Sequence, residues 1–225
     1  YDSLQYGRDL GTVDDIFIDG QKNVWFGRNT GISVLSAQEE QIRYYPLEKY
    51  GLKERIYPGR LAYDPGTNTV FVVDHAHDGT GRRIFSISLE SDDSRLYFDS
   101  PSPVTGIALD TSKNLWINRD GNFYKADLRS GKKPERVLEL NCGVPIPRFW
   151  NLTMTPDGWM CGLGTEVFIW FKPGQACRIL DRNKIPNYPV RPINTFFQGV
   201  FYTRNQEAIL FSNQAVLLDL VSGKT

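Results

Sequence analysis

The sequence predicts an all-β protein built as a β-propeller, and an internal repeat is the main reason. Five positions that each close an alternating apolar segment recur at intervals of 45 to 48 residues: Asp19, Asp64, Asp110, Thr155 and Thr203. A polar turn and then a bulky, β-rich segment follow each of them. Four short strands at this period are typical of a propeller blade. A four-stranded meander buries neither of its faces alone, so successive blades must pack on one another.

The first repeat shows this pattern most clearly. Its first strand ends at Asp19, and a polar turn at residues 20–23 leads into a second strand at 24–27. A polar turn of this kind between two β-rich segments indicates a hairpin. A third strand is expected at residues 32–35 and a fourth at 41–45. Because Asp19 recurs at a turn, we interpret it as a turn former that binds nearby backbone amides.

The later repeats predict the same order of strands. Third strands are expected at residues 84–87, 123–126, 167–170 and 216–218, and fourth strands at 95–98, 135–138 and 177–180. The fifth repeat lacks a fourth strand, and we expect residues 4–6 to supply it and to close the ring. The prediction is a single domain over 1–225 with blades at about 10–52, 53–101, 102–144, 145–188, and 189–225 plus 1–9. Five repeats taken from a longer ring of six to eight blades are the alternative.

A bulky side chain near the start of each second strand is expected to pack in the core. We align Trp25 with Phe71, Trp116, Trp159 and Leu210 at this position. Aromatic rings bury a large apolar area, so these tryptophans are interpreted as packing residues and not as ligand contacts.

Composition excludes some partners. The 225 residues carry 26 basic and 26 acidic side chains, for a formal net charge of +0. A balanced charge argues against a nucleic-acid binder or a polybasic membrane binder. No apolar segment approaches the length of a membrane span. The chain begins at Tyr1 without a signal-like segment, so we expect a processed protein or an excised domain.

The cysteines Cys142, Cys161 and Cys177 lack the spacing of a zinc site. One disulfide is compatible with this count and would leave one free thiol. The interpretation we favour from the sequence is that all three are buried thiols that pack as small apolar groups.

Residues 13–32 of the first repeat resemble the two-component regulator propeller repeat. The resemblance rests on Asp19, the run Asn23-Val24-Trp25-Phe26-Gly27 and the pair Gly31-Ile32. The third repeat matches in part through Asp110, the run Asn114-Leu115-Trp116-Ile117 and Gly121. The repeats are also similar, more loosely, to streptogramin-lyase-like and gluconolactonase-like propellers. The first resemblance implies a periplasmic or extracellular sensor region of a bacterial hybrid two-component system that binds oligosaccharides and passes on a signal.

Arginines are the main candidates for a ligand site at the mouth of the ring. The loops before the inner strands contain Arg8, Arg60, Arg148 and Arg191, and the loops between second and third strands contain Arg28, Arg119 and Asp120. Guanidinium groups that converge on one rim suit a carboxylate or a sulfate. Recognition of an anionic saccharide is therefore a hypothesis, and local pairing of each arginine with an acidic residue is the simpler interpretation.

Three further residues are candidates for the same site. His75 and His77 alternate on a predicted strand end, so they share a face and could bind a metal if a third ligand joined them. Polar loop residues are the simpler interpretation, and we expect no metal and no cofactor. Trp150 lies beside Arg148 and could stack on a sugar ring.

The sequence favours a binding module over a catalyst. It contains no nucleophile elbow, no zinc-protease motif and no phosphate-binding loop. The expected partner is an oligosaccharide or another small molecule, in a signalling or uptake system, with no nucleic acid. A protein–protein scaffold is the first alternative. A propeller lyase with His75 or His77 as a general base, or a glycoside hydrolase, is the second.

Overall fold

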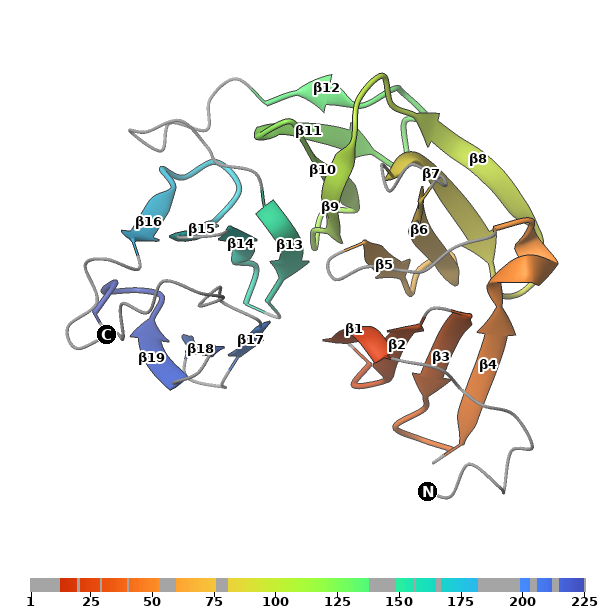
Figure 1. Cartoon of the computed structure of the whole chain (residues 1–225), viewed down its shortest axis with the longest axis horizontal. Helices are drawn as coiled ribbons and strands as arrows, with labels where there is room; N and C mark the ends of the chain where they lie inside the picture. The colour runs from red at the N-terminus through yellow and green to blue at the C-terminus, as the bar shows by residue number, and fades with distance from the viewer. Residues whose placement is uncertain are drawn as a thin grey trace. The chain divides into compact units, whose positions relative to one another are not determined.

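The structure is a computed structural model that describes residues 13–19, 21–28, 30–39, 41–52, 60–75, 81–137, 149–155, 157–164, 167–181, 199–202, 206–211 and 215–224. These residues form antiparallel strands and one short 3-10 helix (Figure 1). The chain divides into two compact units, Tyr1–Ile107 and Ala108–Thr225, and each is considered by itself below.

The first unit contains two four-stranded meanders. Sheet 1 consists of β1 (Val13–Ile18), β2 (Val24–Arg28), β3 (Gly31–Leu35) and β4 (Ile42–Pro46). The 3-10 helix η2 (Leu47–Tyr50) follows it, and sheet 2 consists of β5 (Leu61–Asp64), β6 (Thr69–His75), β7 (Gly81–Ser88) and β8 (Ser94–Asp99). In both sheets the strands pair antiparallel and in chain order.

Sheets 3 to 5 follow along the chain, and sheet 3 begins at the boundary between the units. It consists of β9 (Val104–Leu109), β10 (Asn114–Arg119), β11 (Asn122–Asp127) and β12 (Glu135–Arg136). Sheet 4 consists of β13 (Phe149–Met154), β14 (Met160–Gly164), β15 (Val167–Phe171) and β16 (Arg178–Asp181). Sheet 5 contains β17 (Gly199–Tyr202), β18 (Glu207–Phe211) and β19 (Ala215–Asp219). Every predicted third and fourth strand overlaps a strand of the structure, which confirms the four-stranded repeat.

The chain turns after β19 as it turns before β4 and β8. The amide of Asp219 donates to the carbonyl of Lys224 at 2.9 Å, five residues later. Ser36 bonds in the same way to Gln41 at 3.1 Å, and Ser88 bonds to Asp93 at 2.9 Å. Residues 219–224 therefore form the same hairpin turn that leads into the fourth strand of sheets 1 and 2. The predicted pairing of residues 4–6 with this sheet lies outside the described residues.

Neighbouring sheets within a unit bury their faces against each other. In the first unit, Trp25 and Ile32 of sheet 1 form one core with Leu61 and Val72 of sheet 2. Leu47 of η2 joins this core, so the link between the sheets also packs inside. In the second unit, one core joins sheets 3 and 4 and another joins sheets 4 and 5. This arrangement follows from the period-2 alternation of the strands, which gives every meander two apolar faces.

One backbone feature recurs in the turn between the first and second strands of all five sheets. A residue with positive φ stands just before the second strand: Lys22 (67°), Asn68 (47°), Lys113 (66°), Gly158 (81°) and Gln206 (59°). We call the recurring residue that closes each first strand (Asp19, Asp64, Asp110, Thr155 or Thr203) the marker residue. The positive-φ residue lies three residues after the marker residue in four sheets and four residues after it in sheet 2, where the turn is one residue longer. The left-handed conformation lets the chain reverse tightly into the hairpin.

The strand register corrects two of the predicted alignments. Trp25 lies opposite Phe17, two residues before its marker, and the equivalent pair in sheet 4 is Thr153 with Cys161. Trp159 therefore lies in the turn, two residues before Cys161, which is the position equivalent to Trp25. In sheet 5 the equivalent residue is Ile209, opposite Phe201, and not Leu210. The prediction was wrong here because sequence spacing alone does not reveal which residues pair across the hairpin.

Candidate functional site

The turn between the first and second strands is held by its marker residue, most completely in sheets 1 and 3. The carboxylate of Asp19 accepts hydrogen bonds from the amides of Gln21 (2.8 Å) and Asn23 (3.0 Å), the Asn23 side chain (2.9 Å) and the indole N–H of Trp25 (2.8 Å). This confirms the predicted turn former and adds a bond to the core tryptophan. We call this arrangement of carboxylate, turn and indole the Asp–Trp clamp.

Sheet 3 repeats the Asp–Trp clamp bond for bond. Asp110 accepts from the amides of Ser112 (2.9 Å) and Asn114 (2.8 Å), from the Asn114 side chain (2.8 Å) and from the indole of Trp116 (2.8 Å). Trp116 is 3% exposed and Trp25 is 1% exposed, which confirms that both are packing residues. The clamp ties the turn to the core between sheets.

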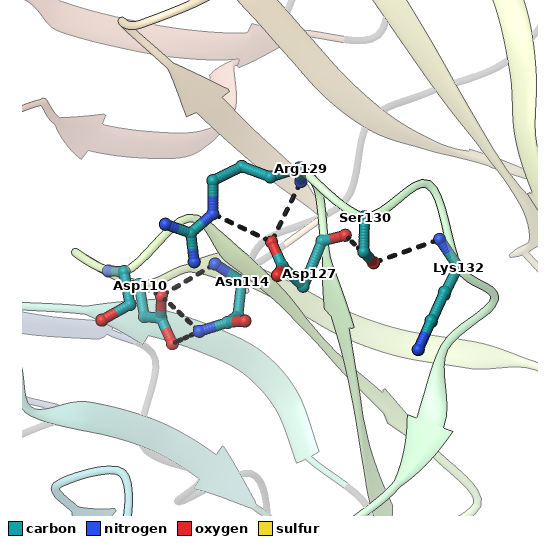
Figure 2. Close-up of polar contacts among 7 residues, drawn as sticks. Asp110, Asn114, Asp127, Arg129, Ser130 and Lys132 are labelled. Atoms are coloured by element: carbon teal, nitrogen blue, oxygen red, sulfur yellow. Dashed lines mark hydrogen bonds and ion pairs between the residues drawn. The ribbon is translucent and has the colours of Figure 1, made fainter.

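Figure 2 shows the end of sheet 3 that carries this clamp, together with the turn after β11. Asp127 accepts from the amide of Arg129 at 3.0 Å and from its Nε at 3.1 Å. These bonds, the backbone one first, lower the pKa of the Asp127 carboxyl below its ordinary value. Ser130 Oγ donates to the Asp127 carbonyl and accepts from the Lys132 amide. The polar groups of this end thus mostly bind one another.

The opposite end of each sheet, where the second strand ends and the third begins, is called the corner here. The second strands end at Arg28, His75, Arg119, Gly164 and Phe211 in sheets 1 to 5. Two of these corner residues are arginines and the others are histidine, glycine and phenylalanine, whereas the turn end is built in a similar way from sheet to sheet. Side chains that vary on a regular frame are typical of a ligand-binding face.

Arg28 lies at the corner of sheet 1, as predicted, but it faces inward. It is 8% exposed, its Nε donates to Ser33 Oγ at 3.0 Å, and its guanidinium carbon lies 5.7 Å from the centre of the Phe26 ring. Burial lowers the pKa of Arg28 from its ordinary value, although the guanidinium stays charged. Arg28 therefore supports the corner from within and does not face solvent.

Sheet 2 holds two more of the predicted residues. Arg60 is half-buried, and its carbonyl accepts from the amide of Val73 at 3.0 Å, which places it at the corner beside the end of β6. Asp74, 5% exposed, forms an ion pair with Arg83 of β7. His75 ends β6, but only its backbone is described.

The other predicted site residues lie outside what the structure describes. His77, Arg148, Arg191 and Arg8 fall in undescribed segments, and only the backbone of Trp150 is described, in β13. In the described part of the chain, no group of three His, Cys, Asp or Glu side chains could hold a metal ion.

The corner of sheet 3 brings together residues that the sequence suggested only in part. The guanidinium of Arg119 lies 3.9 Å from the centre of the Tyr124 ring, within the range of a cation–π contact. Arg136 of β12, which sequence reasoning missed, donates from Nη2 to Asn122 Oδ1. Arg136 could be identified only from the pairing of β11 with β12, which places it opposite Tyr124.

The cysteines differ from the interpretation favoured above. Cys177 takes part in a disulfide, whereas Cys161 is a thiol, 1% exposed, in the core of sheets 4 and 5. Cys142 lies outside the described residues. The prediction of three buried thiols was wrong for Cys177, because sequence spacing gives no distance between cysteines that are far apart in the chain.

Solved structures share this fold. The chain matches a structure of a nidogen–laminin complex with a TM-score of 0.67 and 16% identity, over 96% of this chain and 78% of that one. It matches the extracellular domain assigned to a hybrid two-component system of B. thetaiotaomicron with a TM-score of 0.65 and 16% identity, over 97% of this chain and 28% of that one. It matches streptogramin B lyase with a TM-score of 0.62 and 15% identity, over 93% and 65%.

No family model matches the chain, and no curated protein sequence matches it either. Within the described residues, no helix has the length and apolar character that crossing a bilayer requires. The chain spans less than a third of the sensor chain and just under two thirds of the lyase chain. At these identities the likeness shows the fold alone, so the protein is an all-β chain of antiparallel β-propeller blades.

Proposed function

We propose that the protein is a ligand-binding propeller of the sensor type, which recognises an oligosaccharide through the corners of its blades. The observation that carries this proposal is the contrast between the two ends of the sheets. The turn ends repeat the same backbone geometry and, in sheets 1 and 3, the same Asp–Trp clamp. The residue type at the corner varies on that frame, with arginine in sheets 1 and 3 and histidine, glycine and phenylalanine in sheets 2, 4 and 5. A constant frame with variable ends supports selective binding and does not require a catalytic group.

The disulfide at Cys177 supports an exported protein. Disulfides persist in oxidising compartments such as the bacterial periplasm and are rare in the cytosol. The likeness to an extracellular sensor domain agrees with that location. We therefore place the binding event in the periplasm or outside the cell.

A thermal-shift screen of the purified chain tests the proposal. A ligand that binds only the folded protein raises Tm through mass action. We expect one class of neutral or acidic oligosaccharide to raise Tm in a concentration-dependent way, and isothermal titration calorimetry to give a saturable binding curve. The absence of any shift or heat across both classes would contradict the proposal.

A protein–protein scaffold is the second candidate, and one surface favours it. Ile16 and Ile18 of β1 are 55% and 63% exposed, whereas Leu61, Ile107 and Leu152 at the position of Ile16 are 5%, 0% and 1% exposed. Exposed apolar side chains on one strand suit a protein partner. The variant Ile16→Ser/Ile18→Ser would then abolish capture of that partner, while oligosaccharide binding would stay unchanged.

A further inference from the structure

The corner of sheet 3 contains a row of four side chains on one face. Arg119 of β10 pairs directly with Asn122 of β11, and Tyr124 of β11 pairs directly with Arg136 of β12. Directly opposed residues in an antiparallel pair point to the same face, and so do residues two apart on one strand. All four side chains therefore share one face of sheet 3.

The two arginines of this row lean over the middle strand from opposite sides. Arg119 reaches diagonally to the Tyr124 ring, with 3.9 Å between its guanidinium carbon and the ring centre. Arg136 reaches diagonally to the side chain of Asn122. Two positive groups are thus held above β11, one by an aromatic face and one by an amide oxygen.

Neither arginine has an acidic partner in the described part of the chain. Arg43, Arg83 and Arg129 form ion pairs with Glu39, Asp74 and Asp127. No such pair is formed by Arg119 or Arg136 among the described residues, although the exposed Asp120 is next to Arg119 in sequence. Two guanidinium groups over one strand repel each other, and an anion between them would offset that repulsion.

We propose that Arg119, Tyr124 and Arg136 form a binding site for the anionic group of the ligand, a carboxylate or a sulfate carried by a saccharide. This inference rests on the proposed function and names its ligand class. Arg136 is exposed and Arg119 is half-exposed, so both can reach a ligand from solvent. Guanidinium groups bind carboxylate and sulfate in fork geometry, and the exposed part of the Tyr124 ring can contact the sugar.

The test measures binding of three probes by isothermal titration calorimetry: an oligogalacturonate, its carboxyl-reduced neutral counterpart and a sulfated oligosaccharide. The proteins are the whole chain, Arg119→Gln, Arg136→Gln, the double variant and Arg129→Gln as a matched control. Arg129 is an exposed arginine at the other end of the same sheet (Figure 2). Each site substitution should weaken binding of an anionic probe about tenfold, and the control should stay within about twofold. The affinity should also fall as salt is raised.

The outcomes separate this inference from the proposed function. Loss of anionic binding in the double variant, with the Arg129→Gln control unchanged, supports the site, and the more tightly bound of the two anionic probes identifies its anion. Equal affinity of the double variant and the unchanged chain would overturn the site while leaving oligosaccharide binding in place. Tight binding of the neutral probe, with no binding of either anionic probe, would also overturn the site and leave oligosaccharide binding in place. Failure of all three probes to bind the unchanged chain would overturn the site, and the wider thermal-shift screen would then decide the proposed function.

Discussion

The turns of sheets 3 and 4 differ in how they hold a buried tryptophan. In sheet 3 the Asp110 carboxylate accepts from the turn amides and from the indole of Trp116, which stands six residues later. In sheet 4 the marker is Thr155, whose hydroxyl accepts from the amide of Trp159 at 2.9 Å. The indole N–H of Trp159 is buried and has no hydrogen-bond partner among the described residues.

This difference shows what the Asp–Trp clamp requires. A carboxylate has two oxygens and can accept several bonds, whereas a hydroxyl oxygen accepts fewer. The tryptophan must also stand six residues after the marker, and in sheet 4 it stands four residues after it. Thr155 therefore holds the turn but leaves the indole unsatisfied, so sheet 4 keeps the fold with a weaker turn.

The largest expected effect comes from removal of the clamp in sheet 3. Asp110→Ala removes every bond to its carboxylate and leaves the buried Trp116 N–H unsatisfied, so we expect a loss of about 2 to 4 kcal/mol in the free energy of unfolding. Thr155→Ala removes one accepted bond and should cost about 1 kcal/mol. Urea unfolding measures both, and the exposed Asp157→Ala is the control, expected within about 0.5 kcal/mol of the unchanged chain. Equal losses at Asp110 and Thr155 would contradict the comparison.

A matched pair of tryptophan substitutions isolates the indole bond. Trp116 and Trp159 are 3% and 6% exposed, and each ring has a lysine over it, Lys125 and Lys172 respectively. Phenylalanine removes similar apolar area at both sites, but only at Trp116 does it remove a hydrogen bond. Trp116→Phe should therefore cost about 1 to 3 kcal/mol more than Trp159→Phe in the same urea experiment. A larger loss at Trp159 would show that the unsatisfied indole is not a weakness of sheet 4.

The smallest effect is expected at the positive-φ position of the turns. A Cβ at Gly158 would meet no atom within 4 Å, so Gly158→Ala changes only the backbone preference at φ 81°. We expect it to cost about 1 kcal/mol. At Lys22 of sheet 1, φ is 67°, and Lys22→Gly relieves strain but loses entropy on folding, so its effect should lie within about 0.5 kcal/mol of zero. Thermal unfolding monitored by circular dichroism distinguishes the two, and a stabilising Gly158→Ala would contradict the assigned turn geometry.

The fold could be predicted from the sequence because polar residues that suit a turn recur at a nearly constant interval. Asp19 and Asp110 are turn formers by residue type, and the alternating segments around them define strands, so the four-stranded unit could be predicted without coordinates. The register could not be predicted, since a shift of two residues leaves the alternation intact. The sequence therefore aligned Trp159 with Trp25, although Trp159 lies two residues before the equivalent position, Cys161.

The candidate site was predicted only in part for a related reason. Their loop positions made Arg28 and Arg119 equal candidates for a ligand site. In the structure Arg28 is buried and donates to Ser33, whereas Arg119 lies at the surface over the ring of Tyr124. Arg136 stands on a fourth strand of two residues, and its place beside Tyr124 depends on cross-strand pairing. Which charged groups meet is a property of the folded sheet and not of the spacing along the chain.

We propose that the turn ends build the frame and that the corners bind the ligand. The most direct test follows backbone amide chemical shifts of the whole chain by NMR while oligogalacturonate is added. We expect shifts concentrated at residues 119–124 and 135–137, with little change at residues 110–114 and 127–130 of the same sheet. Shifts concentrated at the turn end of sheet 3, with none at its corner, would contradict this proposal.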